Sequence, residues 1–496
     1  MKKLFFIFLV FACQVKEPVQ THEPLEYSTP EAEGVSSKGI LDFIEAAETQ
    51  QPDALHSMMI VRHGKIIAEG WWNPYNADSP HLLYSLSKSF TSTAIGFAVQ
   101  ENLLTIDDPV ISFFPDKTPE NPSENLKNMR IRDLLRMTTG HATDSYGRIK
   151  DHPDGWVSGF LSLPVEHKPG TLFIYNTGAT YMLSAILQKV TGLTLVEFLQ
   201  PRLFDPLGIK KPFWQSDPEG INLGGTGLYV TTKDIAKLGQ LYLQKGNWKG
   251  QQMLNEAWVN MATSLQASNG SNPESDWDQG YGYQFWRCQH GNYRGDGAFG
   301  QYCIVMPELD AVIAITSGSN DMQGILNMVW DNVLPAIQDE ALATDEASLN
   351  ALKARLENLA LSTISGEEKS PLADELTGKK FKIEANNLGV EAIAFDLIDG
   401  EKHLTIWNSE GEQSIPVGFN TMLKGNFSFP KQITWATAAS GAWISDTNYK
   451  VKIYNIESPH GITFDFKFNG NTMTWDSESN VSFGSAKLPQ MKGNVE

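Results

Sequence analysis

A serine and a lysine, Ser85 and Lys88, stand three residues apart at the start of a stretch that reads as a buried helix. Residues with this spacing on a helix lie on the same face, one turn from each other. A serine hydroxyl is a weak nucleophile at neutral pH and needs an adjacent base. A buried lysine can be that base, because burial disfavours its ammonium form. The pair therefore predicts an activated serine nucleophile.

The same pattern, S-x-x-K, also occurs at Ser428 to Lys431, where Pro430 would break a helix. At the first turn of its helix, Ser85 would in addition present its own backbone N–H to a developing negative charge. The alternative for Ser85 is a helix N-cap serine with a solvated lysine one turn on. The four residues alone leave both interpretations open.

From about residue 33 to residue 335 the chain resembles the serine β-lactamase and penicillin-binding-protein-like hydrolases, in particular the class C β-lactamase-related group. The resemblance lies in ordered stretches at 58–70, 85–102, 104–110, 131–140, 169–175 and 225–234. It implies an α/β fold of the β-lactamase and transpeptidase type, an antiparallel sheet flanked by helices. It also implies a serine acyl hydrolase in which Ser85 and Lys88 are catalytic. We expect no cofactor, and we expect no metal because the sequence has neither an H-E-x-x-H nor a C-x-x-C motif.

The family has a second motif, Tyr-x-Asn, whose tyrosine is a general base or proton relay beside the serine. The resemblance places it at Tyr175, Asn176 and Thr177, so that threonine stands where the family usually has asparagine. A threonine hydroxyl would replace the donors and the carbonyl of an amide. The resemblance thus implies a catalytic Tyr175 and substrate contacts from Asn176 and Thr177. The alternative for Tyr175 is a packed aromatic residue with a satisfied hydroxyl.

The third family motif, Lys-Thr-Gly or His-x-Gly, aligns with Gly295, Asp296 and Gly297, followed by Ala298. The resemblance makes the Ala298 N–H the second oxyanion donor beside that of the nucleophile, and places Asp296 and Gly297 at the substrate. The family's cation and hydroxyl attract a substrate carboxylate, whereas an aspartate would repel it. Arg294 points away from the Gly295 side by strand alternation. We therefore expect weak or absent β-lactamase and carboxypeptidase activity, unless Asp296 is only a turn-forming acid.

A long segment between residues 140 and 169 carries His141, Tyr146, Trp156 and Phe160 and has little regular periodicity. Long loops in compact domains are often functional, and aromatic side chains suit an apolar acyl or aryl group. We therefore expect Trp156 to contact the substrate. The alternative is that these aromatic residues anchor the loop to the core.

The N-terminal segment has the pattern of a bacterial export signal: two lysines, the apolar run 4–11, and a cysteine at Cys13. The run is too short to span a bilayer. The cysteine resembles a lipobox, which predicts a lipid on Cys13 and a location on the periplasmic or surface side of the envelope. Phe11 is unusual in a lipobox, so simple secretion is the alternative.

The length of 496 residues exceeds the roughly 250–300 residues at which single cores stop growing. After a helix with Leu349 and Leu352 on one face, the pattern from about residue 376 alternates as strands do. The predicted organisation is a signal peptide over 1–13, a tether over 14–29, a hydrolase domain over 30–342, a linker helix and loop over 343–371, and a C-terminal antiparallel sandwich or open barrel over 372–496.

The net charge of −19 argues against a nucleic-acid partner, and it leaves the lipid anchor as the expected membrane contact. Cys288 and Cys303 are expected to be buried free thiols. The sequence favours an esterase or amidase that forms an acyl-enzyme with a small ester, amide or peptide. The alternatives are a D-amino-acid-specific peptidase or transpeptidase and a non-catalytic ligand-binding surface lipoprotein. The sequence does not determine the oligomeric state.

Overall fold

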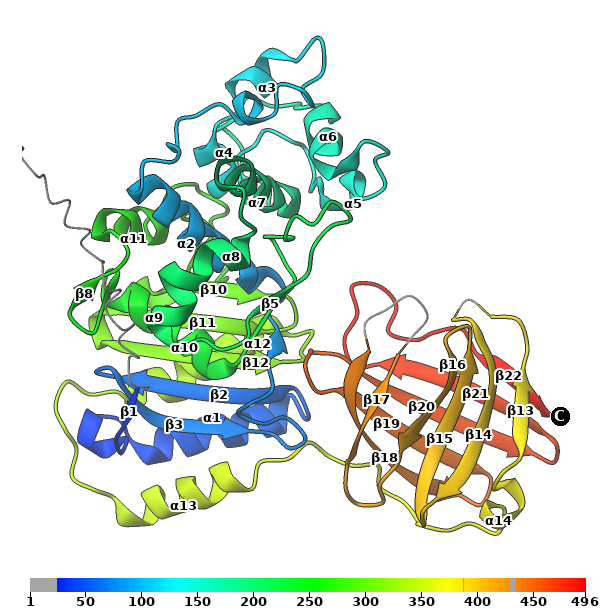
Figure 1. Ribbon diagram of the computed structural model, residues 1–496. Coiled ribbons are helices and arrows are strands. Elements are labelled where there is room, and N and C mark those ends of the chain that lie inside the picture. The colour runs from blue at the N-terminus through cyan, green and yellow to red at the C-terminus, as the bar shows by residue number, and fades with distance from the viewer. Residues whose placement is uncertain (1–24, 387, 429–433) are drawn as a thin grey trace, which may run out of the picture.

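The computed structural model describes residues 25–386, 388–428 and 434–496 (Figure 1). Its α/β part is a sheet flanked by helices, and its C-terminal part is an all-β, barrel-like sheet, as the expected fold class requires. The leader, Cys13 and residues 14–24 of the predicted tether lie outside the described residues, so export and lipid attachment stay predictions.

Seven strands form the sheet of the α/β part, and every pairing is antiparallel except that of the two strands at one edge. In spatial order they are β1 (Glu26–Tyr27), β3 (Lys65–Trp71), β2 (Leu55–Arg62), β12 (Ala311–Ser317), β11 (Gln301–Met306), β10 (Tyr293–Gly297) and β9 (Trp286–Arg287). The sequence had assigned residues 26–27 to the tether. They form β1 instead, because the backbone of β3 would otherwise be unpaired at the sheet edge.

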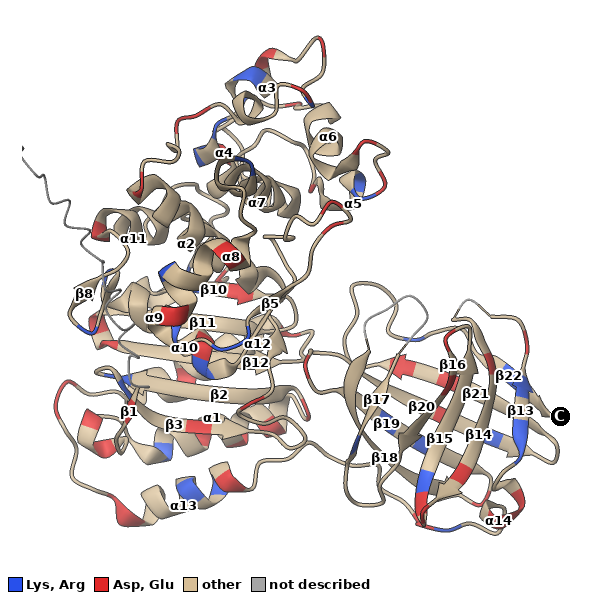
Figure 2. Ribbon diagram, viewed as in Figure 1, with Lys and Arg blue, Asp and Glu red and all other residues tan. Residues whose placement is uncertain are grey.

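The central strands bury side chains on both faces of the sheet. In β2, Met59 and Val61 belong to one hydrophobic core, and Met58 and Ile60 belong to the other. Successive side chains of a strand point to opposite faces, so a continuous apolar run serves two cores. Charged residues lie mainly on outer helices and loops, and none lies on β11 or β12 (Figure 2).

Helices cover both faces. The core on one face contains α1 (Ser37–Gln50) and α12 (Met322–Met328), with α13 (Glu346–Glu357) packed against α1. The core on the other contains α2 (Ser87–Gln100) and α10 (Thr232–Leu243). The other elements of this part are β4 (His81–Leu82), α3 (Glu124–Asn128), α4 (Ile131–Leu135), α5 (Tyr146–Ile149), α6 (Gly155–Ser162), α7 (Thr177–Thr191), α8 (Leu195–Leu199), α9 (Asp205–Leu207), β5 (Phe213–Trp214), β6 (Leu228–Val230), β7 (Asn247–Trp248), β8 (Gln251–Gln252) and α11 (Glu256–Thr263).

The C-terminal part is one antiparallel sheet of ten strands, whose end strands also contact each other, so that it closes as a barrel would. In spatial order they are β16 (Gly411–Pro416), β15 (Glu401–Asn408), β14 (Val390–Ile398), β13 (Lys380–Ile383), β22 (Met491–Val495), β21 (Thr472–Ser479), β20 (Gly461–Asn469), β19 (Asn448–Asn455), β18 (Trp435–Ser445) and β17 (Leu423–Phe427). A short helix, α14 (Ala373–Leu376), precedes them. The alternating residues Phe464, Phe466 and Phe468 of β20 are buried in its core, as period-two patterning predicts.

The two cysteines of the α/β part are buried and free, as expected. Strand β10 lies between β9 and β11, so the segments before Cys288 and around Cys303 do not pair with each other directly. Burial raises the pKa of the Cys288 thiol to about 11 and that of Cys303 to about 12, which keeps both protonated at neutral pH.

Candidate active site

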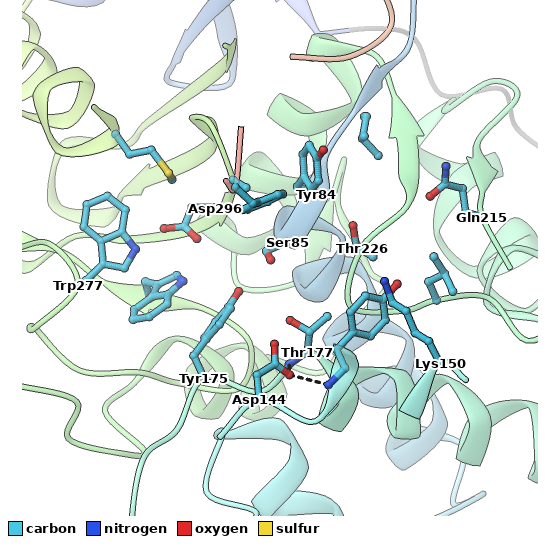
Figure 3. Close-up of a pocket in the computed structure, with 17 residues that line it drawn as sticks. Tyr84, Ser85, Asp144, Lys150, Tyr175, Thr177, Gln215, Thr226, Trp277 and Asp296 are labelled. Atoms are coloured by element: carbon cyan, nitrogen blue, oxygen red, sulfur yellow. Dashed lines mark hydrogen bonds between the residues drawn. The ribbon is translucent and has the colours of Figure 1, made fainter. Parts of the chain in front are cut away.

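A cavity of about 820 Å³ opens at the N-terminal end of α2 (Figure 3). Five residues from the three motifs of the resemblance line it: Ser85, Tyr175, Thr177, Asp296 and Ala298. They come from the 3-10 turn Tyr84–Leu86 before α2, from the segment that leads into α7, and from the end of β10 with the residue after it. Segments far apart in the sequence are therefore brought to one cavity.

Lys88 lies beneath Ser85, with 1% of its surface exposed. Its Nζ lies 2.9 Å from Ser85 Oγ, 2.7 Å from the Gly225 carbonyl oxygen and 3.3 Å from Thr177 Oγ1. A neutral amine has two N–H donors and one lone pair. The donors match the Gly225 and Thr177 oxygens, and the lone pair is left to accept the Ser85 O–H. The alternative interpretation of Lys88 as a solvated lysine is therefore wrong.

Desolvation by burial lowers the pKa of Lys88 from 10.5 to about 7, although Asp144 and Asp296 act in the opposite direction. A substantial fraction of the amine is then neutral at physiological pH. A base works best when its pKa lies near the pH at which it operates. The burial of Lys88 therefore gives it the electrostatic character that proton abstraction from Ser85 requires.

The Tyr175 hydroxyl and the Ser85 side chain point toward each other across the cavity floor (Figure 3). Lys88 Nζ lies 4.9 Å from the centre of the Tyr175 ring, and the ring stacks on Trp286 with centroids 5.2 Å apart. Desolvation by burial raises the pKa of Tyr175 well above 10, and the nearby Asp296 adds to the rise, against a hydrogen bond with Ser85. The hydroxyl therefore stays protonated, which suits a proton relay better than a phenolate base.

Thr177 and Asn176 have different positions although they are neighbours. Thr177 lines the cavity, and its backbone N–H donates to Asp144 Oδ1 at 2.9 Å (Figure 3). Asn176 is fully buried and is the N-cap of α7, where its Oδ1 accepts from the Ala179 N–H and from Ser145 Oγ. The structure therefore places Asn176 away from the cavity, because its amide is used to begin a helix.

The two expected oxyanion donors flank a tight contact between β10 and the turn before α2. A Cβ at position 297 would lie 2.0 Å from the Leu83 carbonyl oxygen, so Gly297 acts by permitting this approach and does not itself line the cavity. Among the hydrogen bonds between described residues, none uses the backbone N–H of Ser85 or of Ala298. Tyr84, which precedes Ser85, has a φ of 47°, a strained backbone conformation next to a residue that lines the cavity.

Asp296 is not an isolated charge. Arg294 lies on the same side of β10, and its Nη2 and Nε lie 2.8 and 3.0 Å from Asp296 Oδ2. Burial raises the pKa of Asp296, whereas Arg294 lowers it. The Arg294 side chain is completely buried, so the cavity is lined by the carboxylate and not by the guanidinium. No side chain fits at Gly295, where a Cβ would lie 2.4 Å from Leu86 Cδ1.

The aromatic residues of the 140–169 segment are mostly structural. Tyr146 lines the cavity, and Lys150 Nζ lies 4.2 Å from the centre of its ring. Trp156, which we had expected at the substrate, is buried behind Tyr146 and does not line the cavity. His141 and Phe160 are buried against each other. The segment contains the short helices α5 and α6 where a loop was expected, and neither is long enough for its periodicity to show which residue faces the cavity.

Several residues at the site were missed from the sequence. Asp144 lies in the segment between residues 140 and 169, and Gly225 lies in a stretch that carries the resemblance. The sequence pattern predicts a role for neither residue. Trp277, Trp286 and Phe483 also line the cavity. Nothing in the sequence near these three aromatic residues marked them, since each reaches the cavity only through tertiary packing.

Comparisons with known proteins find similar sequences and a similar fold. The sequence model of the β-lactamase family matches residues 45–334, more than half of the chain. The 6-aminohexanoate-dimer hydrolase of Paenarthrobacter ureafaciens is 24% identical over 56% of this chain and 78% of its own length. A putative D-alanyl-D-alanine carboxypeptidase of Escherichia coli K12 is 23% identical over 53% and 76%. The crystal structure of a putative β-lactamase from Bacteroides dorei shares the fold, with a TM-score of 0.52 and 18% identity over 60% of this chain and 99% of that one.

Proposed function

The chain belongs to the β-lactamase family of serine hydrolases, and from this premise we propose that it cleaves small esters or amides through an acyl-enzyme on Ser85. The observation that carries the proposal is the environment of Lys88, whose Nζ contacts Ser85 Oγ while almost wholly buried. Burial destabilises the ammonium form, and a protein without turnover would gain nothing from that cost. This supports an enzyme over a non-catalytic ligand-binding lipoprotein.

In the proposed acylation, Ser85 Oγ attacks the substrate carbonyl carbon while the neutral Lys88 amine accepts the serine proton. The carbonyl oxygen becomes negatively charged and receives hydrogen bonds from the N–H groups of Ser85 and Ala298. Tyr175, protonated because of its raised pKa, donates a proton to the leaving alkoxide or amine and is reprotonated by Lys88. The C–O or C–N bond breaks, and the acyl group stays on Ser85.

Deacylation uses the same groups with water as the nucleophile. The neutral Lys88 amine accepts the proton of the attacking water through the Tyr175 hydroxyl, which passes its own proton to Lys88 as it takes the proton of the water. Lys88 then returns a proton to Ser85 Oγ as the acyl–oxygen bond breaks. The products are a carboxylic acid and the alcohol or amine released in the first step. Water is the only co-reactant that the atom balance requires.

The charges beside the nucleophile support one class of substrate. Asp144 and Asp296 both line the cavity, against one cationic residue, Lys150, among the described residues that line it, and the guanidinium that balances Asp296 is buried. Trp277 and Trp286 provide aromatic surface for an apolar group. We therefore favour a neutral or amine-bearing ester or amide over a substrate with a carboxylate next to the scissile bond. A D-amino-acid-specific peptidase or transpeptidase is the alternative, suggested by the relative named a putative D-alanyl-D-alanine carboxypeptidase.

Rapid-mixing kinetics with p-nitrophenyl acetate tests the acyl-enzyme. We expect a burst of p-nitrophenol equal to the enzyme concentration, followed by slower steady turnover, because acylation by an activated ester outpaces deacylation. A screen of linear amides then compares ester with amide cleavage. Absence of both burst and turnover in well-folded protein would contradict the proposal.

Nitrocefin and penicillins are expected to be poor substrates. Their carboxylate would be placed beside Asp296, and the resulting repulsion reduces kcat/KM by about a hundredfold or more relative to p-nitrophenyl acetate. Steady-state kinetics on the purified protein measures both values. The variant Asp296→Asn leaves the Arg294 charge uncompensated and is expected to shift the ratio toward nitrocefin. Wild-type turnover of nitrocefin as efficient as that of the ester would show that the repulsion is absent.

A further inference from the structure

Two loops of the C-terminal barrel reach the active site of the α/β part. The first, residues 456–460, joins β19 to β20 and is held by backbone and side-chain contacts. The Leu82 N–H donates to the Glu457 carbonyl oxygen at 2.8 Å, and the Tyr75 hydroxyl donates to that of Ser458 at 3.0 Å. Since Leu82 itself lines the cavity, this loop is attached directly to the wall of the site.

The second loop, residues 480–490, joins β21 to β22 and is fixed at its base by Asn480. The Asn480 side chain donates to the Pro459 carbonyl oxygen at 2.9 Å, which connects the two loops. The Asn480 carbonyl oxygen accepts from Asn320 Nδ2 at 3.1 Å, which connects the second loop to the α/β part. Phe483, three residues further along the chain, therefore lies close to a fixed point of the loop.

An aromatic cluster joins these loops to the residues around the nucleophile. The Phe483 ring lies 4.7 Å from that of Phe299 and 5.6 Å from that of Tyr84, measured between centroids. The Tyr84 hydroxyl is 2.6 Å from His460 Nε2, so the first loop holds the same tyrosine. Tyr84 precedes Ser85, and Phe299 follows Ala298. The cluster thus contacts the neighbours of both proposed oxyanion donors.

Phe483 itself is 77% exposed although it lines the cavity. Its packing on Tyr84 and Phe299 leaves most of the ring uncovered, and an apolar group of a bound substrate would cover it. Leu82 and Leu223 lie in the same cavity lining and extend the apolar surface.

We propose that Phe483 is a specificity-determining residue, with which the C-terminal domain contributes a contact for an apolar group of the substrate. The inference rests on the proposed function, because it concerns the substrate of that same site. It gives the barrel a role in substrate choice beyond support of the fold. The expected preference is for esters or amides with an extended alkyl or aryl group over those with a small one.

The test compares p-nitrophenyl acetate with p-nitrophenyl octanoate in wild type, Phe483→Ala and Phe483→Leu. The alanine variant is expected to lose about tenfold in kcat/KM for the octanoate, mainly through KM, with the acetate changed less than about twofold. The leucine variant restores part of the loss because it restores part of the apolar surface. Ile444→Ala is the matched control. Ile444 is another exposed apolar side chain of the same domain. It lies at the end of β18, next to the start of β19, whereas the first loop follows the end of β19. Its removal should change kcat/KM for neither ester.

An unchanged octanoate-to-acetate ratio in an active Phe483→Ala variant would overturn the inference and leave the proposed function intact. An equal loss on both esters would also overturn it, since that pattern reports a structural effect. Wild-type protein that is inert toward both esters and unreactive toward a fluorophosphonate would overturn the proposed function and this inference together.

Discussion

Ser85→Ala is expected to abolish covalent labelling by a fluorophosphonate and to reduce ester hydrolysis by at least about ten-thousandfold. The reagent reacts with serine oxygens made nucleophilic by an adjacent base, and Ser85 Oγ lies 2.9 Å from Lys88 Nζ. Intact-mass spectrometry should detect one adduct on the wild type and none on the variant. The substitution leaves the backbone N–H donors in place, so any residual rate reports those donors and substrate binding alone.

Ser89→Ala is the matched control, since this serine lies one turn further along α2. Its hydroxyl donates to the Gln284 carbonyl oxygen at 2.9 Å, and it does not line the cavity. Loss of that hydrogen bond costs about 1 kcal/mol of stability and should leave the adduct unchanged. A fluorophosphonate adduct that persists in Ser85→Ala would place the reactive serine elsewhere and refute the assignment.

Lys88→Met is expected to reduce acylation by about a thousandfold or more, since general-base assistance contributes about a hundred- to ten-thousandfold and this base is in direct contact with the nucleophile. The wild-type kcat/KM should rise with pH through an apparent pKa of about 7, because the neutral amine is the active form. Methionine has a similar length and no titratable group, so this acidic limb should disappear. Stopped-flow measurement of acylation across the pH range gives both results.

The same lysine affects stability in a direction that can be checked. Its folded-state pKa of about 7 lies below the ordinary lysine value of 10.5, so between these values the unfolded chain binds more protons than the folded one. The contribution of Lys88 to the free energy of unfolding therefore rises with pH across this window. The free energies of unfolding of wild type and Lys88→Met, measured with denaturant, should therefore differ by an amount that changes with pH across this window.

In the kinetic test, a Lys88→Met variant that keeps the acidic limb of the wild-type kcat/KM profile would exclude Lys88 as the base.

Much of the site followed from local sequence patterns because it depends on short-range geometry. A helix places residues 85 and 88 on one face whatever surrounds it. Strand alternation likewise puts Arg294 and Asp296 on the same side of β10, and explains why Phe464, Phe466 and Phe468 are buried together. The resemblance placed Tyr175 at the cavity, where the structure also has it.

Other features could not be predicted because they depend on contacts between distant segments. The identity of Asn176 did not reveal that its amide caps α7, nor did that of Trp156 reveal that it packs behind Tyr146. The ion pair of Asp296 with Arg294 required knowing that both are buried. The helices that carry Tyr146 and Trp156, α5 and α6, have only four and eight residues, too few for the sequence pattern to show which face is buried.

The sequence by itself determined the chemistry available to this protein, a serine with a lysine one helical turn away in an α/β fold followed by a β domain. Only the tertiary structure decided the surroundings of that serine and lysine and the surfaces that line the cavity beside them. The pKa of Lys88 falls because α2 is buried beneath Gly225 and Thr177, and Phe483 reaches the cavity because a C-terminal loop is anchored there. Desolvation and packing arise from atoms brought together by folding, whereas helical and strand periodicity are already present in the chain.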